Sequence, residues 1–166
     1  MKSVDNITDP NDLIIEIEAK LTQYKLDKGL LIRETFTLWY ILVEGRQCEN
    51  FTEEEITALL KRNFELYQAH YLNDADFHFI FGWIINVAFW YLDTNLNEEY
   101  GNELLNKAYR SNPKNKLFTW AIRHELNLKD NEVNDLKIDI ASRFEQFYNY
   151  GTFIKEYFLN VINTPH

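Results

Sequence analysis

The chain has 166 residues, a formal net charge of −9 and a pI of about 4.9, and 46% of its residues are hydrophobic. This length and apolar content predict a single folded domain spanning residues 1–166 and exclude an intrinsically disordered chain. The acidic balance opposes binding to nucleic acid and to anionic membranes, because both require basic groups. It either favours a basic protein partner or simply keeps the protein in solution.

The low content of turn-forming residues favours an all-α fold. Five glycines and three prolines are too few for a β-sandwich or barrel, and no segment alternates between polar and apolar residues with period two. About eight helices, packed as antiparallel helical hairpins, are predicted. They cover about 9–25, 30–44, 52–71 and 74–92, then one opening at Asn97, one bearing Leu117–Ile122, one over about 131–148 and one after Gly151.

Several helix ends carry sequence signals. Thr52 followed by Glu55 predicts a capping box, and Asp74 predicts the cap of the next helix. Gly45 is a stop signal. Lys28 and Gly29 are interpreted as a turn between the first two helices.

The segment from Asp74 to Leu92 is apolar on nearly every face, which predicts a helix surrounded by other elements. Its apolar run over 79–92 is shorter than a bilayer span and has no basic flanks, so protein rather than lipid should surround it. The polar or small residues Asp74, His78, Gly82 and Asn86 recur every four positions and therefore share a stripe.

The sequence contains none of the standard catalytic or metal-binding motifs. The four histidines show no HExxH pattern, and there is no CxxC, GxSxG or glycine-rich phosphate loop. We therefore expect no catalytic residues, no metal site, no cofactor and no enzymatic activity. Cys48 is the single cysteine, so the fold needs no disulfide.

The stripe on the central helix leaves alternatives open. Asp74 and His78 form either an acid–base pair or a helix cap with a histidine that the cap satisfies. Gly82 either allows close helix packing or forms a cavity floor. Asn86, if buried, needs a hydrogen-bond partner.

Residues 100–113, YGNELLNKAYRSNP, resemble the second helix of a tetratricopeptide repeat. Gly101, Leu105, Ala108 and Pro113 fall at the small, large, small and terminal-proline positions of that family. Because the preceding helix is out of register and no second copy aligns, the match indicates helix-pair geometry. A tetratricopeptide-like adaptor that binds peptides is therefore the alternative function.

The 26 aromatic residues exceed what the core obviously requires. Neighbouring pairs such as Trp39–Tyr40 and Trp90–Tyr91 cannot both point into one core from adjacent helix positions. Some of these rings therefore belong either to a second packed face or to a partner surface.

Two segments resemble one group of small all-helical bacterial immunity proteins, from contact-dependent growth inhibition and related toxin–immunity systems. The residues that carry the resemblance are Asp76, Phe77, Gly82 and Trp83 in the central helix, and Gly151, Phe153, Glu156, Tyr157 and Phe158 near the end. The resemblance implies a protein that binds the toxic domain of a large secreted protein and blocks its active site. Many such toxins are nucleases with basic grooves.

The function that this resemblance implies is a cytoplasmic protein that neutralises a cognate, basic toxin domain. The absence of signal-peptide features in MKSVDNITDPND agrees with a cytoplasmic location. Acidic residues near helix starts are the predicted partner-binding residues: Glu53, Glu54, Asp74, Asp76, Glu98 and Glu99. A third possibility is an enzyme that uses Asp74, His78 and Asn86.

Overall fold

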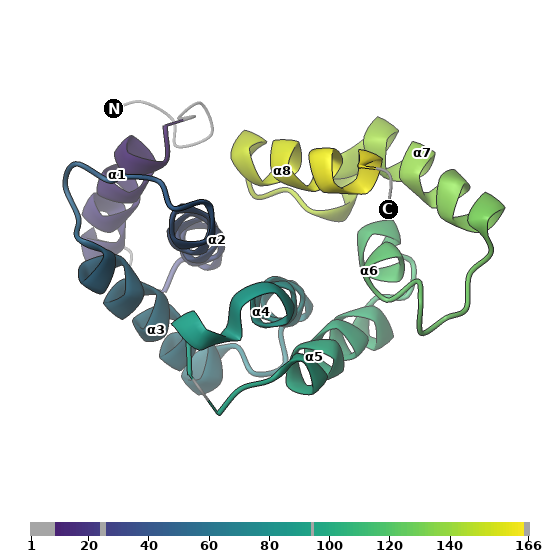
Figure 1. Ribbon diagram of the computed structural model, residues 1–166, viewed down its shortest axis with the longest axis horizontal. Helices are drawn as coiled ribbons and strands as arrows, with labels where there is room; N and C mark the ends of the chain where they lie inside the picture. Colours follow the sequence, from purple (N-terminus) through teal and green to yellow (C-terminus); the bar gives the residue numbers. More distant parts are fainter. Residues whose placement is uncertain (1–8, 24–25, 94, 165–166) are drawn as a thin grey trace.

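The computed structural model describes residues 9–23, 26–93 and 95–164, and in these ranges the fold is all-α, as predicted (Figure 1). Eight α-helices and one short 3-10 helix are present in the described part, and no strand occurs there. The elements are α1 (Pro10–Gln23), α2 (Lys28–Glu44), α3 (Glu53–His70), α4 (Ala75–Ala88), η2 (Phe89–Tyr91), α5 (Glu98–Ser111), α6 (Lys116–Ala121), α7 (Asp130–Phe147) and α8 (Thr152–Asn163).

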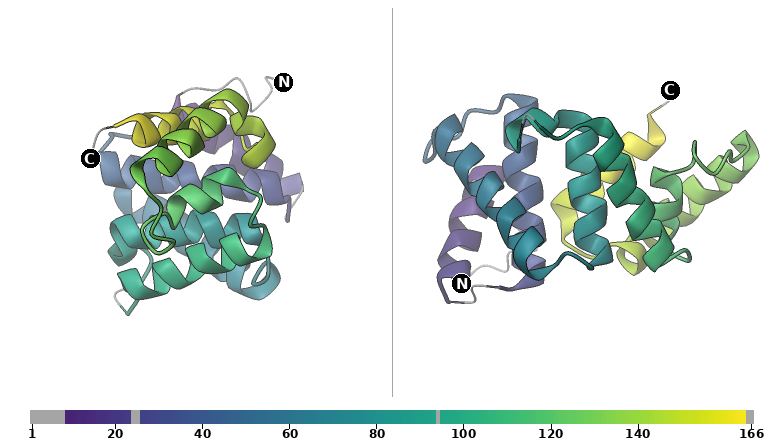
Figure 2. Two further views of the ribbon diagram at one scale, coloured as in Figure 1. Left: turned by 90° about the vertical axis from the view of Figure 1, so that its right-hand side faces the viewer. Right: turned by 90° about the horizontal axis from the view of Figure 1, so that it is seen from below.

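The helices pack as consecutive antiparallel hairpins that curl into a ring. α1 packs on α2, α2 on α3, α4 on α5, α6 on α7 and α7 on α8. Figure 1 shows α2 and α4 toward the inside of the ring, and Figure 2 shows the first half of α7 extending beyond the rest of the fold. The chain closes the ring when α8 returns beside α2.

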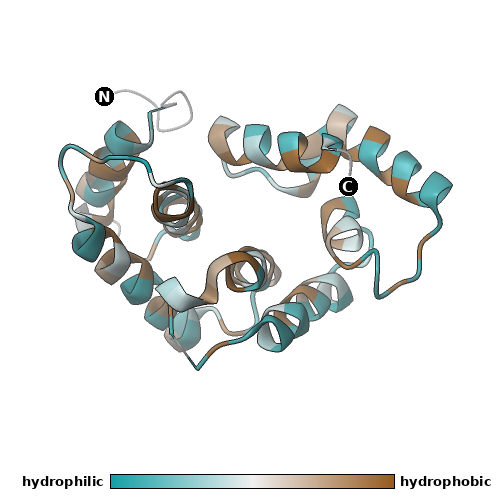
Figure 3. Cartoon of the chain, viewed as in Figure 1, coloured by the Kyte–Doolittle hydropathy of each residue, from teal (hydrophilic) through white to brown (hydrophobic). Residues whose placement is uncertain are grey.

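Helix α4 is enclosed by aromatic side chains from its neighbours, as the sequence predicts. Phe81 stacks on Tyr67 of α3 at 4.9 Å between ring centroids, and Phe79 stacks on Phe118 of α6 at 5.1 Å. Trp83 meets Phe158 of α8 at 5.2 Å. Figure 3 shows this apolar character of the inner helices, yet none of the described helices is long and apolar enough to cross a bilayer.

Side-chain caps fix most helix starts. Thr52 and Glu55 form the predicted capping box of α3, and Asp74 accepts backbone hydrogen bonds at the start of α4. Asn97 caps α5 in the same way. The interpretation of Lys28 and Gly29 as a turn was wrong, because the Asp27 carboxylate caps α2 and both residues lie in its first turn.

The predicted central helix over 74–92 is shorter in the structure. Ala88 leaves the helical region, with φ −158° and ψ 55°, and residues 89–91 form the 3-10 helix η2. This break lets the Tyr91 hydroxyl donate a hydrogen bond to the Leu42 carbonyl at the end of α2. It also leaves Trp90 exposed, whereas Leu92 is buried.

One predicted helix end is not tested, and one predicted helix contains a kink. The predicted end of the first helix near Lys25 lies outside the described residues. In α7, Arg143 adopts non-helical angles of φ −141° and ψ 31°, which kink the helix one turn before its end.

Helices α4 and α5 cross at a point where both carry glycine. A Cβ atom on Gly82 would lie 2.9 Å from the Gly101 carbonyl oxygen and 3.0 Å from the Leu105 nitrogen. Beside this crossing, the Asn86 amide donates to Asn102 Oδ1 at 2.7 Å. The close-packing interpretation of Gly82 is therefore the one that the structure supports.

Replacing Gly82 with alanine should destabilise the fold. The added methyl group meets backbone atoms, so the helices must separate, and overpacking of this kind costs about 1–3 kcal/mol. We expect a lower free energy of unfolding in urea denaturation. The matched control is Gly29→Ala in α2, where the methyl group approaches only the Asp27 carboxylate, at 3.3 Å. If Gly82→Ala is as stable as the wild-type chain, α4 and α5 do not cross closely enough at Gly82 to exclude a methyl group.

Candidate functional site

Three helix starts and two helix ends meet at the end of the ring that faces the viewer in Figure 1. Helices α1, α3 and α5 begin there, and α2 and η2 end there, because consecutive helices are antiparallel. The Cys48 thiol donates to Asn11 Oδ1 at 2.8 Å and ties the α2–α3 connection to α1.

We call this region the acidic end because its exposed charges are almost all carboxylates. Its exposed acidic residues are Asp9, Asp12, Glu44, Glu49, Glu53, Glu54, Glu55, Asp93, Glu98 and Glu99. Arg46 is the single basic residue in the segments 9–15, 40–58 and 87–103 that build this end. Its guanidinium lies 4.9 Å from the centre of the Tyr40 ring.

Helix geometry explains why carboxylates gather at the acidic end. The first turn of a helix has unpaired N–H groups and a partial positive charge, so acidic side chains there are stabilised. Hydrogen bonds from the Thr52 backbone and hydroxyl lower the pKa of Glu55. Glu53, Glu54, Glu98 and Glu99 have no hydrogen-bond or ion-pair partner among the described residues, so their charges face solvent.

An exposed tryptophan lies at the same end, in the 3-10 helix η2. Trp90 in η2 is 54% exposed and Val87, one turn earlier in α4, is 39% exposed. Large exposed apolar side chains beside polar groups are typical of protein interfaces. The exposure of Trp90 agrees with the prediction that some aromatic side chains lie outside the core. Trp39 is buried instead, and Tyr40 packs on Phe153 of α8.

The six predicted partner-binding residues do not form one surface. Glu53, Glu54, Glu98 and Glu99 lie exposed at the acidic end, but Asp74 and Asp76 lie at the opposite end of α4. Lys28 Nζ contacts Asp74 at 2.6 Å and Asp76 at 2.8 Å.

Asp74 and Asp76 instead hold helices together. Partial burial lowers the pKa of Lys28, but the two carboxylates outweigh it and raise the pKa overall. The Tyr150 hydroxyl donates to Asp76 Oδ2 at 2.6 Å, and the Tyr148 hydroxyl donates to the Asp76 carbonyl at 3.2 Å. Burial and the nearby carboxylate raise the pKa of Tyr150. This cluster joins α2, α4 and the α7–α8 connection.

The stripe of Asp74, His78 and Asn86 makes separate contacts. His78 is buried, and its Nε2 lies 2.7 Å from the Leu72 carbonyl oxygen rather than on the Asp74 carboxylate. Burial lowers the pKa of His78, so the ring is neutral and Nε2 carries the proton. Backbone therefore satisfies one ring nitrogen of His78, whereas the buried Nδ1 has no hydrogen-bond partner in the described part of the structure, and the predicted pairing with Asp74 is wrong.

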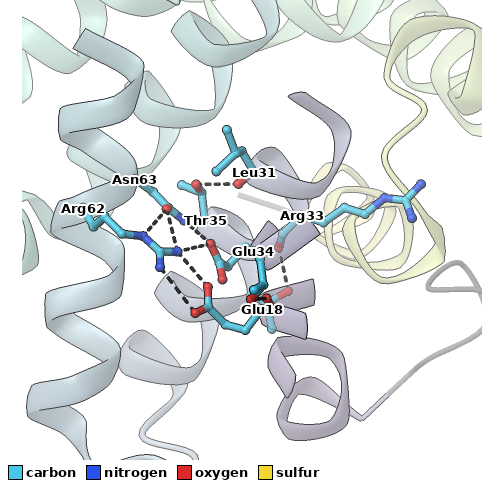
Figure 4. A network of polar contacts seen from close by, with 9 residues as sticks. Glu18, Leu31, Arg33, Glu34, Thr35, Arg62 and Asn63 are labelled. Atoms are coloured by element: carbon cyan, nitrogen blue, oxygen red, sulfur yellow. Dashed lines mark hydrogen bonds and ion pairs between the residues drawn. The ribbon is translucent and has the colours of Figure 1, made fainter. Parts of the chain in front are cut away.

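A buried polar network, which the sequence analysis missed, connects the first three helices (Figure 4). Glu34 of α2 is fully buried, and its Oε2 accepts from Arg62 Nη2 and Asn63 Nδ2, at 2.7 Å each. Arg62 also binds Glu18 of α1 at 2.8 Å. The signal was present, because Glu34 lies in the otherwise apolar face of LLIRETFTLWYILV.

The environment of Glu34 favours its protonated form. Burial raises the pKa of Glu34 to about 8, with a further contribution from Glu18, and the charge of Arg62 only partly opposes this. Glu34 Oε1 is buried and accepts no hydrogen bond in the described part of the structure. A proton on this carboxyl allows it to donate toward Glu18, and the same interaction lowers the pKa of Glu18.

Comparison with known proteins yields no match to a family model, to a curated protein or to a solved structure. Among the described residues, no group of three or more histidine, cysteine or acidic side chains is arranged to hold a metal ion. The chemistry of the molecular surface and the sequence resemblance are therefore the features that bear on function.

Replacing Glu34 with glutamine should change how stability depends on pH. The pKa of Glu34 is about 8 in the folded state and 4.5 as its reference value. Because the folded-state pKa is raised, its stabilising contribution is complete below the unfolded pKa and is lost as pH rises through the folded pKa. Between about pH 5 and about pH 9 the free energy of unfolding of the wild-type chain should therefore fall by about 2–4 kcal/mol, and that of Glu34→Gln should not show this fall.

This difference is measured by urea denaturation of both chains across that pH range. Glu65→Gln, at an exposed position of α3, is the matched control and should follow the wild-type curve. If Glu34→Gln also follows it, Glu34 does not carry the proton.

Proposed function

We propose that this chain is a cytoplasmic immunity protein of a contact-dependent growth inhibition or related toxin–immunity system. In this proposal it has no enzymatic activity and neutralises a cognate toxin domain, a basic nuclease, by covering its active site. The observation that carries the proposal is the acidic end, which combines exposed carboxylates with the exposed side chain of Trp90.

The charge distribution supports a basic protein partner. Carboxylates without an ion-pair partner keep most of their field, which steers an oppositely charged partner toward them and discriminates against acidic proteins. A nuclease active site is basic because it binds phosphates, so a surface of clustered carboxylates complements it. Glu53, Glu54, Glu98 and Glu99 supply part of this charge in the proposed complex.

Trp90 supplies the apolar anchor in the proposed complex. Charged rims contribute mainly to the rate and specificity of association, whereas a few buried aromatic side chains contribute most of the affinity. Trp90 has a large exposed area beside the carboxylates, and it lies on the 3-10 helix that interrupts the helical run after α4.

A tetratricopeptide-like adaptor is the second candidate function. The glycine crossing of α4 and α5 supports hairpin packing of that kind. Repeat adaptors, however, bind peptides on an open concave surface. Here aromatic side chains such as Phe79, Phe118 and Phe158 fill the space inside the circle of helices. The adaptor would have to use an outer surface, so immunity remains the first proposal.

The proposal is tested by co-expression with candidate basic toxin domains, beginning with any that a neighbouring gene encodes. Rescue of growth and a nanomolar 1:1 complex are expected. Replacing Glu53, Glu54, Glu98 and Glu99 with lysine should reduce the association rate about tenfold or more and weaken its dependence on salt. Stopped-flow fluorescence at several salt concentrations measures both effects.

For comparison with the two substitutions Glu53→Lys and Glu54→Lys alone, a charge-matched control reverses two charges away from the acidic end, with Glu65→Lys and Asp135→Lys, which are both exposed. This variant should associate at nearly the wild-type rate. Failure of the wild-type chain to bind the toxin domain would remove the immunity proposal. Capture of short peptides from many proteins would instead support the adaptor.

Replacing Trp90 with alanine should weaken the toxin complex mainly through faster dissociation. Loss of an interface tryptophan costs about 2 kcal/mol or more, which corresponds to about a 30-fold higher Kd. Surface plasmon resonance measures the dissociation rate, and thermal unfolding should be almost unchanged because the side chain is largely exposed. Ile138→Ala, at a 67% exposed apolar position on α7, is the control. Equal dissociation rates for the two variants would exclude Trp90 as the anchor.

A further inference from the structure

A pocket of about 730 Å³ lies between α6 and the first half of α7. Figure 2 shows this part of α7 extending past the rest of the ring. The volume falls in the range of small-molecule sites, which is about 300–1,000 Å³. The side chains that line it are Trp120, Arg123, His124, Leu128, Asp130, Val133, Asn134 and Lys137.

The arginine in this pocket has no acidic partner. The Arg123 guanidinium lies 4.4 Å from the centre of the Trp120 ring, and its Nη1 donates to the Trp120 carbonyl at 3.1 Å. Within the described residues no carboxylate lies at ion-pair distance from it. Partial burial lowers the pKa of Arg123, and no neighbouring charge offsets that effect. A half-buried cation without a counter-ion is costly, and an incoming anion would relieve that cost.

Other charges in the pocket reinforce this preference. Lys137 is half-buried, and no described acidic side chain pairs with it. His124 adds a third basic group at the surface. Asp130 is the acidic side chain of the lining, but it lies in the first turn of α7, where the helix N-terminus stabilises its charge. The pocket therefore has two permanent cations against one carboxylate, in a chain whose net charge is −9.

We propose that this pocket binds a small organic anion whose carboxylate or phosphate group pairs with Arg123 and Lys137. The guanidinium of Arg123 is held by its stacking on Trp120, so its remaining N–H groups can form a fixed fork for two oxygens. Leu128 and Val133 form an apolar wall that can contact the body of the ligand. This site is independent of the proposed toxin-binding surface.

Titration of the full chain with phenyl phosphate, benzoate and inorganic phosphate tests the site. Binding is followed by NMR through the indole signal of Trp120 and by calorimetry. Phenyl phosphate or benzoate should shift that signal and bind more tightly than inorganic phosphate, because only the organic anions also contact the apolar wall. No shift with any of the three at millimolar concentration overturns the proposal, and so does equal binding of phenyl phosphate and inorganic phosphate.

Variants locate the charge that binds. Arg123→Gln should weaken binding about tenfold, since a charge-assisted hydrogen-bond pair is lost. Lys137→Gln should also weaken binding. Because this substitution leaves the Arg123–Trp120 stack intact, it tests the site even where Arg123→Gln perturbs the fold. Lys114→Gln is the charge-matched control, because Lys114 is exposed in the turn before α6 and does not line the pocket. If Lys114→Gln weakens anion binding as much as Lys137→Gln does, the effect comes from overall charge, and the proposed site is overturned.

Discussion

The burial of α4 on nearly every side is the constraint on which the rest of the structure depends. No single neighbour can cover a helix that is apolar all round, so the other helices must surround it. Tyr67 of α3, Phe118 of α6 and Phe158 of α8 do so with their rings, and α5 does so through the glycine crossing. The ring of hairpins follows from this requirement, because helices far apart in the sequence have to reach the same central element.

Most of the fold was predictable from sequence because its determinants are local. The capping box at Thr52 and the caps at Asp74 and Asn97 each depend on side chains within three residues of the backbone that they satisfy. The break at Ala88 was not predictable, since it depends on the contact of Tyr91 with the end of α2. Periodicity in the sequence therefore indicates helices, but long-range contacts decide where some of them end.

The candidate site was predictable only in part, for a related reason. Acidic residues in a first turn look alike in the sequence, yet Glu53 and Glu98 face solvent whereas Asp74 and Asp76 bind Lys28. Which carboxylates remain free depends on how the helices pack. The same applies to Arg123, whose lack of an acidic partner becomes evident only when the neighbours of α6 are in place.

The contact between α2 and α8 has a consequence for synthesis of the protein. Phe36 meets Tyr157 at 5.1 Å, and Tyr40 meets Phe153 at 4.9 Å, across more than a hundred residues of chain. While the polypeptide is still emerging from the ribosome, Phe36 and Tyr40 lack these α8 partners until α8 has been made. The incomplete chain therefore exposes part of its aromatic surface for most of its translation, and exposed apolar surface of this kind favours aggregation.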